Sequence, residues 1–492
     1  MVASGAFAIV PRHVLGGAGY VAPSDKIAMA HIGMGTQGFN ELGGLLANPE
    51  IQIVAVCDPN RESNDYVEWG KGSVRKRIRA LLGDPAWKEN EPGCPGGREI
   101  GRQVVNAYYA RERKAWKYEG CRAYSDFREL LAKEKGIDVV KIMTPDHLHA
   151  PISIAAMNQG IHVLVHKPLA NRLYESRRVI ETARKTKVVT YFLPYGSGEA
   201  MRLIVARINA GVIGKLREVH NWSSRPMWPQ YTEIPADRPP VPRGFDWDLW
   251  LGPEQDRPYH PHYTHAVFRG WYDFGGGSLA DMGHYSLWPV FTGFQLGSPF
   301  SVQAWQTHFC SIVDQVSKRV KNDFSFPAAC TIQFKYAARG DMPALDLFWY
   351  DGGMRPRVPE EMVAEEQDFS PEGIMFIGDQ GKIVAGFTGQ NPQIYPKSRS
   401  DLLGISPAPP SGGSRRGTEP GRRELWLEAI KGGPPSPGAF PNAAALSDSV
   451  NLGAIALRAG RKILFDSENM KITNVSEANK YMFREYRKGW EL

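Results

Sequence analysis

The apolar residues of this 492-residue chain follow two different periods over its first 190 positions. Short apolar runs, typical of buried strands, alternate with segments whose apolar residues recur every three to four positions, as in helices. The strand-like runs are Ile27–Ile32, Ile51–Val56, Val139–Met143, His162–Val165 and Val188–Phe192. The helical segments include the one carrying Leu42, Leu45 and Leu46, then Tyr124–Lys135, Pro151–Gln159 and Arg172–Lys185. This alternation predicts an α/β fold with a parallel, doubly wound sheet.

The pattern changes from about Tyr195 onward. One helical segment ends at Gly211, and strand-like runs joined by hairpins and loops follow. These runs are Leu216–Trp222, Val302–Phe309, Ala328–Tyr336, Leu345–Tyr350, Gly373–Ile377 and Lys382–Ala385. They predict a second, α+β domain with a mostly antiparallel sheet. Ile405–Gly421 is predicted to be a loop, and Glu424–Lys431 and Asn442–Arg461 are predicted to be helices.

These patterns divide the chain into three parts. Residues 1–24 form an N-terminal arm or the remnant of an export signal. Residues 25–194 form a nucleotide-binding domain, interrupted by a polar insertion at about 66–120 that is helical at both ends. Residues 195–492 form the second domain.

Composition excludes several classes of protein. A hydrophobic content of 42% with 23% charged residues is typical of a globular protein with an ample core. The net charge of +7 is dispersed and accompanies no nucleic-acid-binding motif, so no nucleic-acid partner is expected. No apolar run reaches the length of a membrane span. The apolar start, Val2–Val10, lacks a basic segment before it. It is either a trimmed export signal, which places the protein in the periplasm or cell envelope, or an arm of a cytoplasmic protein.

Neither the cysteines nor the histidines form a recognisable metal or disulfide pattern. The five cysteines are scattered; Cys57 is expected in the core, and Cys94 and Cys121 flank the insertion and can pair in an oxidising compartment. His260, His262 and His265 lack the cysteine or acid that would complete a zinc site, so no metal is expected. Some of these histidines are instead expected to form hydrogen bonds to a polyhydroxylated substrate.

The first strand leads into a glycine-rich turn, and this turn points to a dinucleotide. Gly33 permits a tight turn, Gly35 permits approach of phosphates to the backbone, and Gly38 permits close packing of helix on strand. The intervening Thr36 and Gln37 open the helix, whose N-terminus favours anions. Asp58, twenty residues after Gly38, is placed to accept hydrogen bonds from ribose hydroxyls and to repel a 2′-phosphate. NAD is therefore expected as cofactor in preference to NADP, although Arg61 leaves NADP open.

Lys167 follows a buried strand and precedes a proline. It is therefore expected at the carboxyl edge of the sheet, where ligands of open α/β folds bind. A desolvated lysine has a lowered pKa, which suits proton transfer. The alternative is a surface lysine at the end of a strand.

Asp281 and Tyr285 lie in the segment Gly275–Tyr285, GGGSLADMGHY. Positions i and i+4 of a helix share a face, so these two side chains are expected to point to one place, with His284 beside them as an alternative base. A structural alternative is an aspartate that caps the helix, followed by core aromatic residues.

Three motifs in this order resemble the glucose-fructose oxidoreductase/inositol dehydrogenase (Gfo/Idh/MocA) family: Gly33–Gly38, His166-Lys167-Pro168 and Gly275–Tyr285. The resemblance covers nearly everything from Lys26 to Leu492. It implies a Rossmann domain followed by an open antiparallel sheet whose outer face is an oligomer interface, hence a homo-oligomer (dimer or tetramer). It also implies an active site between the domains.

The resemblance also assigns roles to residues. The family motif is Glu-Lys-Pro with a catalytic lysine, here Lys167, and His166 replaces the glutamate. Many members carry histidine where Tyr285 stands; the tyrosine resembles the glucose-fructose oxidoreductase branch, in which it transfers a proton. The implied cofactor contacts beyond the glycine turn are Thr144, Pro145, His149, His166 and Lys167. A histidine such as His147 or His149 is common in this loop, although a structural role fits equally well.

The segment from Trp222 to Phe274 is rich in aromatic residues and proline and poor in regular pattern, so its rings are not all expected in the core. They either bind sugar faces, with arginines and aspartates nearby for hydroxyls, or hold an irregular loop or an interface together. The rings in question are Trp222, Trp228, Tyr231, Trp247, Trp250, Tyr259, Tyr263, Trp271 and Tyr272, and the charged residues are Arg225, Arg243, Asp246, Asp248 and Arg269.

Together these features predict an NAD-dependent oxidoreductase that acts on a secondary hydroxyl of a sugar or glycoside. Lys167, Asp281 and Tyr285, with His284 as alternative base, are the expected catalytic residues. The main alternative is a glycoside hydrolase that uses tightly bound, recycled NAD through a transient keto-sugar. A cofactor-binding protein without catalysis is a third possibility.

Overall fold

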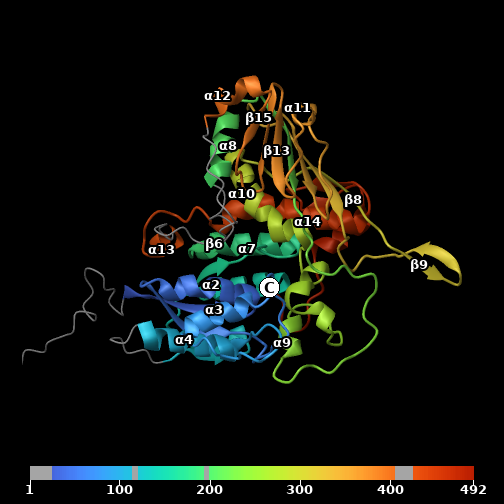
Figure 1. Cartoon of the computed structure of the whole chain (residues 1–492). Coiled ribbons are helices and arrows are strands. Elements are labelled where there is room, and N and C mark those ends of the chain that lie inside the picture. Colours follow the sequence, from blue (N-terminus) through green and yellow to red (C-terminus); the bar gives the residue numbers. More distant parts are fainter. Residues whose placement is uncertain (1–24, 113–119, 193–198, 405–424) are drawn as a thin grey trace, which may run out of the picture. The chain divides into compact units, whose positions relative to one another are not determined.

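The computed structural model describes residues 25–112, 120–192, 199–404 and 425–492 (Figure 1). The N-terminal arm and the predicted loop Ile405–Gly421 lie outside these residues. The chain forms two compact units. The first comprises Met1–Thr144, Gln159–Val163 and Val241–Trp250, and the second Pro145–Asn158, Leu164–Pro240 and Leu251–Leu492.

A six-stranded sheet with the order β3-β2-β1-β4-β5-β6 confirms the predicted doubly wound fold. Strand β1 pairs in parallel with β2 and with β4, and β2 pairs in parallel with β3. Because β1 lies between β2 and β4, the strand order reverses beside it, and such a switch point is where open α/β sheets bind ligands. The strands are β1 (Ile27–Ile32), β2 (Ile51–Cys57), β3 (Arg122–Tyr124), β4 (Val139–Ile142), β5 (His162–Val165) and β6 (Thr190–Phe192).

The helices that alternate with these strands bury the faces their sequences predict. In α2 the apolar side chains Phe39, Leu42, Leu45 and Leu46 are all buried. Almost every residue of α6 is buried, which explains why its sequence is apolar on all sides. The insertion supplies α3 and α4, which pack on each other and on α2. The helices are α2 (Thr36–Ala47), α3 (Ser73–Leu82), α4 (Arg98–Glu112), α5 (Phe127–Lys133), α6 (His149–Asn158) and α7 (Leu173–Thr186).

A nine-stranded sheet with the order β15-β14-β13-β7-β12-β11-β8-β16-β17 forms the core of the second unit. It is mostly antiparallel, as predicted, with β7 and β12 as a parallel pair. Its central strands β11 and β12 alternate buried and half-buried residues, so one face is covered. The strands are β7 (Leu216–Trp222), β8 (Ser301–Gln306), β11 (Cys330–Tyr336), β12 (Leu345–Tyr350), β13 (Gly373–Gly378), β14 (Gly381–Gly386), β15 (Gln393–Tyr395), β16 (Ile463–Asp466) and β17 (Lys471–Ile472).

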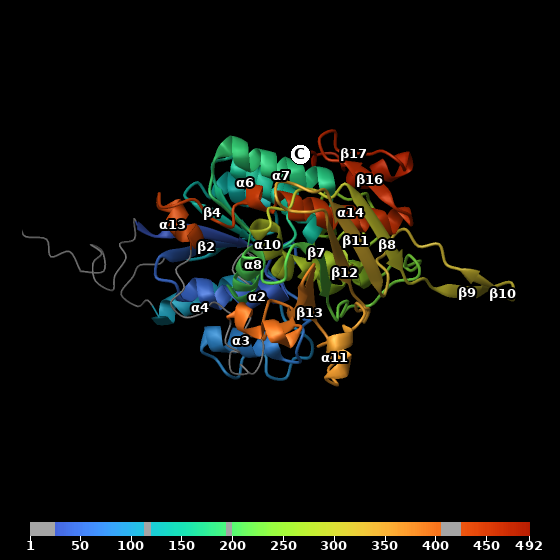
Figure 2. The same cartoon turned by 90° about the horizontal axis from the view of Figure 1, so that it is seen from above.

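Helices α8, α10 and α14 form the layer that accompanies this sheet (Figure 2). α14 packs on β8 and β11, and α10 packs on both α8 and α14. The remaining elements include the hairpin β9 (Cys310–Val313) and β10 (Val316–Arg319). The helices are α8 (Glu199–Asn209), α9 (Trp247–Leu251), α10 (His284–Gly293), α11 (Glu360–Ala364), α12 (Ser400–Leu403), α13 (Leu425–Ile430) and α14 (Ala444–Ala459). Within the described ranges, no helix has both the length and the apolar character that crossing a bilayer requires.

Two expectations about local structure were wrong. The predicted helix Tyr124–Lys135 begins only at Phe127, because Asp126 caps it by accepting a hydrogen bond from the backbone of Arg128. Tyr124 instead ends β3. Cys94 and Cys121 do not pair; both are buried free thiols, like the core residue Cys57.

Candidate active site

The glycine turn of the first unit has the geometry that a dinucleotide requires. Gly33 has φ +99°, and a Cβ added there would lie 2.6 Å from the backbone carbon of Met143. A Cβ on Gly38 would lie 2.3 Å from the carbonyl oxygen of Gly33. Any side chain at either position would therefore push helix α2 away from strand β1. Since α2 begins at Thr36, its N-terminal amides open directly onto the turn, which fits a bound pyrophosphate.

Asp58 stands at the end of β2 and is buried. One carboxylate oxygen accepts a hydrogen bond from the backbone N–H of Met34 at 2.7 Å, and the other accepts one from Asn60 at 2.8 Å. The carboxylate thus lies directly beside the glycine turn. It retains further lone pairs with which to accept ribose hydroxyls, so the residues present fit a dinucleotide.

The remaining predicted cofactor residues already have structural contacts. The hydroxyl of Thr36 donates to the carbonyl of Val67 at 2.6 Å, and the amide of Gln37 donates to Glu41 at 3.0 Å. Thr144 follows strand β4 and approaches Gly33, because a Cβ on Gly33 would come within 2.9 Å of the Thr144 nitrogen.

In the second unit, Pro145 precedes the 3-10 turn η2 (Asp146–Leu148). His149 begins α6, and its Nδ1 lies 2.6 Å from the carbonyl oxygen of Pro168. Because that oxygen can only accept, His149 donates from Nδ1. His149 therefore holds the loop that carries His166 and Lys167.

Lys167, Asp281 and Arg269 form a buried ionic cluster. The Lys167 ammonium is hydrogen-bonded to Oδ1 of Asp281, and Nε of Arg269 lies 3.0 Å from the same oxygen. Lys167 is 7% exposed and Asp281 is 9% exposed. Asp281 belongs to a single π-helical turn, η6 (Leu279–Gly283), that leads into α10. Such turns occur frequently at functional sites.

The cluster shifts the pKa values of both partners. Burial lowers the pKa of Lys167 below its usual value of 10.5; Asp281 opposes this shift and Arg269 adds to it. Burial alone would raise the pKa of Asp281, but the charges of Lys167 and Arg269 hold it well below the usual range. The carboxylate is therefore ionised, and the lysine loses its proton more readily than a lysine in water.

His166 and Tyr285 form a second pair beside the first. Nε2 of His166 lies 2.6 Å from the Tyr285 hydroxyl, and the Lys167 ammonium lies 5.8 Å from the centre of the Tyr285 ring. Two neighbours in sequence, His166 and Lys167, thus contact two residues one helical turn apart, Tyr285 and Asp281. The structure therefore brings together the lysine, aspartate and tyrosine that the sequence identified.

His284 differs from its neighbour Tyr285. It is completely buried, donates from Nδ1 to the carbonyl of Ala280 at 2.9 Å, and packs edge-on against Phe192. Burial lowers the pKa of His284 to about 3, so it is neutral at physiological pH. These contacts are those of a core histidine.

Asp146 is a site residue that sequence reasoning missed. It is buried, and Oδ2 accepts a hydrogen bond from the backbone N–H of Gly276 at 3.0 Å. Burial raises its pKa, while Arg269, His149 and Lys167 act in the opposite direction. Its place one turn beyond the end of β4 is the sequence signal for this residue, the same signal that the neighbouring histidines His147 and His149 give.

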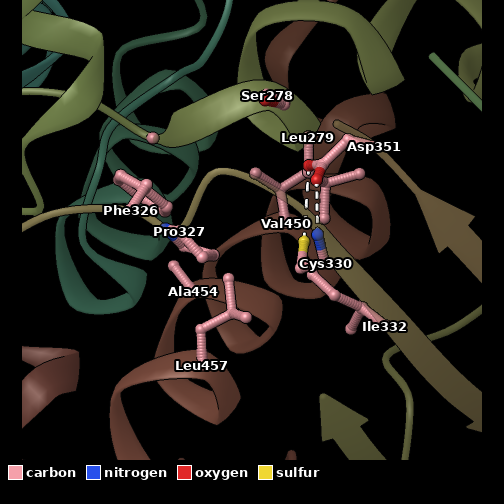
Figure 3. Close-up of a pocket in the computed structure, with 11 residues that line it drawn as sticks. Ser278, Leu279, Phe326, Pro327, Cys330, Ile332, Asp351, Val450, Ala454 and Leu457 are labelled. Atoms are coloured by element: carbon pink, nitrogen blue, oxygen red, sulfur yellow. Dashed lines mark hydrogen bonds between the residues drawn. The ribbon is translucent and has the colours of Figure 1, made fainter. Parts of the chain in front are cut away.

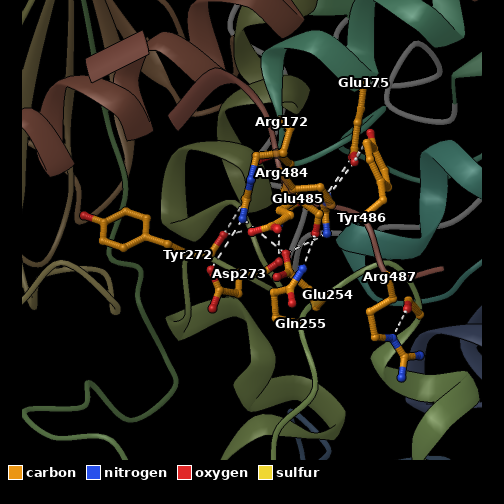
Figure 4. A network of polar contacts seen from close by, with 12 residues as sticks. Arg172, Glu175, Glu254, Gln255, Tyr272, Asp273, Arg484, Glu485, Tyr486 and Arg487 are labelled. Atoms are coloured by element: carbon orange, nitrogen blue, oxygen red, sulfur yellow. Dashed lines mark hydrogen bonds and ion pairs between the residues drawn. The ribbon is translucent and has the colours of Figure 1, made fainter. Parts of the chain in front are cut away.

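A buried ionic network fixes the segments that carry this cluster (Figure 4). Arg172 donates to the carbonyl of Tyr272 at 2.8 Å and to Glu254 at 3.2 Å. Arg484 reaches the same Glu254 at 2.6 Å and Glu175 at 2.5 Å. Arg172 closely follows Lys167, and Tyr272 precedes the glycines before Asp281. Breaking one such pair leaves an uncompensated buried charge, so the network resists displacement of either segment.

A small cavity lies behind the segment that leads to Asp281 (Figure 3). Ser278, Cys330 and Asp351 are among its lining residues, and its volume is about 10 Å³. That is room for one water molecule and too little for a sugar. Asp351 accepts hydrogen bonds from the Cys330 backbone at 2.8 Å and from Trp349 at 3.0 Å, and burial raises its pKa to about 6.

Of the two alternatives for the aromatic segment, the structure favours the one in which the rings hold an irregular loop together. Of the nine rings between Trp222 and Tyr272, all except Trp247 are buried. Tyr231 stacks on Trp271 at 4.5 Å, and Tyr263 meets Trp271 edge-on at 4.8 Å. The rings hold an irregular segment together by packing on one another. Of the charged residues there, Arg269 belongs to the Lys167 cluster and Arg225 pairs with Glu372 at 3.3 Å.

The histidines of this segment contact each other and an acid. The backbone N–H of His262 donates to Nδ1 of His260 at 3.1 Å, and Nε2 of His260 lies 3.2 Å from Asp237. Among the residues that the structure describes, no group of three or more potential ligands could hold a metal ion.

Two family models match the chain. Residues 94–193 match the NAD-binding Rossmann fold of the Gfo/Idh/MocA oxidoreductases, and residues 212–335 match the C-terminal alpha/beta domain of that family.

Curated relatives match only in part. A glycosyl hydrolase family 109 protein of Shewanella baltica (strain OS195) is 28% identical over 202 residues, which are 40% of this chain and 35% of that protein. Levoglucosan dehydrogenase of Pseudarthrobacter phenanthrenivorans is 33% identical over 111 residues, 21% of this chain and 28% of that enzyme. The matched regions thus span about a third of these relatives.

Solved structures share the fold. The WlbA dehydrogenase from Bordetella pertussis, in complex with NADH and UDP-GlcNAcA, superposes with a TM-score of 0.51 at 14% identity, covering 90% of this chain and 99% of that one. The WlbA enzyme of Chromobacterium violaceum gives a TM-score of 0.50 at 15% identity, covering 90% and 97%.

Proposed function

Because the chain belongs to the Gfo/Idh/MocA family of NAD-binding oxidoreductases, we propose that it oxidises a secondary hydroxyl of a sugar or glycoside, with NAD as electron acceptor. The observation that carries the proposal is the pairing of Lys167 with Asp281 and of His166 with Tyr285. Levoglucosan dehydrogenase, a partial match, is named for a sugar substrate, which favours a carbohydrate here too.

The glycine turn and Asp58 would hold the dinucleotide. Bound NAD supplies the acceptor for the two electrons of the C–H bond. The residues of this chain then have to bind the substrate, orient it and remove the hydroxyl proton.

Lys167 is the residue we assign to the reacting oxygen. Its ammonium can donate to that oxygen while Asp281 and Arg269 keep the side chain in place. A cation beside a hydroxyl lowers the pKa of that hydroxyl, because it stabilises the alkoxide that forms.

Tyr285 and His166 provide a route for the proton. As Tyr285 accepts the substrate proton, it can pass its own phenolic proton to Nε2 of His166, 2.6 Å away. The imidazole becomes imidazolium, so no free phenolate has to form. His166 thereby accepts a proton at the position where the family motif has a glutamate. His284, neutral and enclosed in the core, is not needed for this route.

The proposal is tested by NADH formation with a panel of free sugars, glycosides and anhydrosugars. Lys167→Met and Tyr285→Phe should each lower kcat/KM on the best substrate by a factor of about 10² to 10⁴. Tyr350→Phe is a matched control, since Tyr350 forms a similar pair with His220 at 2.9 Å on the nine-stranded sheet. Absence of NADH formation across the panel, or equal activity of Tyr285→Phe and wild type, would contradict the assignment.

A second candidate is hydrolysis of a glycoside with NAD regenerated in each cycle. It is favoured by the partial match to family 109 glycosyl hydrolases and by Asp146, whose raised pKa suits a proton donor to a leaving oxygen. Oxidation and re-reduction cancel in that cycle, so the net reaction is addition of water. Release of nitrophenol from a nitrophenyl glycoside without accumulation of NADH would identify this reaction.

A further inference from the structure

The insertion places a tyrosine ring directly on the glycine turn. A Cβ built on Gly35 would lie 3.0 Å from Cε1 of Tyr66, and one built on Gly96 would lie 2.5 Å from its Cδ2. The ring is therefore held between two glycines, one from the turn and one from the insertion. A side chain on either glycine would displace it.

The hydroxyl end of Tyr66 lies at the ribose-binding acid. The side-chain amide of Asn60 donates to the Tyr66 oxygen at 3.3 Å. Burial, together with the nearby charge of Asp58, raises the pKa of Tyr66 well above 10, so the phenol stays protonated. A protonated phenol next to Asp58 donates to that carboxylate, whose other lone pairs remain available to a ribose.

Hydrogen bonds from both ends of the insertion anchor this arrangement. Thr36 donates to the Val67 carbonyl at 2.6 Å, and the backbone N–H of Gly97 donates to the Met34 carbonyl at 2.9 Å. Arg98 reaches the carbonyl oxygen of Asp58 at 3.0 Å. We call Tyr66, Val67 and the segment 94–98 the Tyr66 cover.

We propose that the Tyr66 cover is a gate for the dinucleotide: NAD enters and leaves only when Tyr66 swings off Gly35 and Asp58. The inference rests on the proposed function for its premise that a dinucleotide binds at the turn. It adds that both association and dissociation of NAD are slow, so the protein retains one NAD molecule over many catalytic cycles. The gate belongs to this chain's insertion and not to the glycine turn itself.

Binding kinetics distinguish a gate from an ordinary contact. A gate slows association and dissociation together, because both pass through the open state, and the equilibrium constant changes little. A residue that merely contacts bound NAD changes the dissociation rate and the equilibrium constant together.

The experiment is stopped-flow NADH binding to purified protein freed of nucleotide, followed by displacement with excess NAD. Tyr66→Ala should raise both rate constants by about tenfold or more, with Kd within about threefold of wild type. Tyr66→Phe keeps the ring and should stay close to wild type. Tyr108→Ala is the control, because Tyr108 lies on α4 of the same insertion and packs with Tyr109 and Arg111.

Two results would overturn the gate: unchanged rates in Tyr66→Ala, or a rise in the dissociation rate alone. Should Tyr66→Ala fail to fold, Arg98→Gln removes an anchor of the cover and predicts the same joint rise. Since no sugar is present, these rates do not depend on the reaction. A protein that binds NADH slowly but oxidises no sugar would refute the proposed function and leave the gate intact. An active enzyme whose NADH exchange is fast and the same in wild type and variants would refute the gate and leave the proposed function intact.

Discussion

Among the described residues, Asp281 is the only carboxylate that contacts both Lys167 and Arg269, and Asp281→Asn removes its charge. The asparagine has nearly the same shape and can still accept a hydrogen bond through its oxygen. What disappears is the negative charge between two cations, each at least five-sixths buried by side-chain exposures of 6% and 16%. The substitution therefore isolates electrostatics from packing.

The magnitude follows from distance and burial. At 3.0 Å, the separation of Arg269 from Asp281, two unit charges attract by about 5 kcal/mol at an effective dielectric constant of about 20. Desolvation offsets much of this attraction in the intact cluster, but removal of one partner leaves the cations buried without it. Such changes cost about 3 to 5 kcal/mol of unfolding free energy.

Chemical denaturation of the nucleotide-free protein at neutral pH measures this cost. The matched control is Asp346→Asn, because Asp346 pairs with Lys335 at 2.9 Å while both side chains are about one-third exposed. That pair should be worth about 1 kcal/mol or less. Equal destabilisation by the two substitutions would refute the view that burial makes the Asp281 cluster special.

The pH dependence gives an independent check. The folded pKa of Asp281 is below its unfolded value, so its stabilisation is complete above the unfolded pKa of about 4 and is lost as pH falls below it. The difference between wild type and Asp281→Asn should therefore be constant at neutral pH and shrink in acid. A difference that grew as the pH fell from neutral would contradict this sign.

Three further predictions follow from single contacts. Gly38→Ala should abolish NADH binding measured by fluorescence titration, because its Cβ would lie 2.3 Å from a backbone oxygen, while Gly44→Ala, with open space around its Cβ, should bind normally. Asp351 has a folded pKa raised to about 6, so its stabilising effect is lost as pH rises from about 4 to 6. Over that range the free energy of unfolding of wild type should fall by on the order of 3 kcal/mol relative to that of Asp351→Asn, measured by chemical denaturation of both proteins at each pH. Tyr285→Phe should remove from the pH profile of kcat/KM the ionisation of the group that accepts the substrate proton, because the tyrosine hydroxyl links the substrate to His166. A profile identical to wild type would exclude the Tyr285–His166 route.

The sheets were predictable from sequence where a strand has a buried face. β1, β2 and β5 stand out because their residues are almost all buried and apolar. β3 has only three residues, with Arg122 exposed, so it shows no apolar run, and its last residue, Tyr124, was assigned to the following helix. The hairpin β9–β10 has every residue exposed and therefore no alternation to detect.

The site was predictable where it follows strand ends and helical spacing. Lys167, Asp281 and Tyr285 were found in this way. The contacts of Arg269 and Tyr66 could not be predicted, because each residue lies in an irregular segment whose path depends on tertiary packing. The aromatic segment left two alternatives open for the same reason: its rings have no periodicity, although they are buried against one another.

The charge balance of the cluster explains which form of a substrate it should favour. Lys167 and Arg269 share one ionised carboxylate, and burial raises the pKa of the remaining acid, Asp146, toward its neutral form. With a proton on Asp146, the cluster carries a surplus positive charge in a site of low polarity. A hydroxyl beside Lys167 then ionises more easily than in water, because the alkoxide supplies the missing negative charge. The same surplus disfavours a cationic group at that position, so an amino sugar whose ammonium replaced the reacting hydroxyl should bind more weakly than the parent sugar.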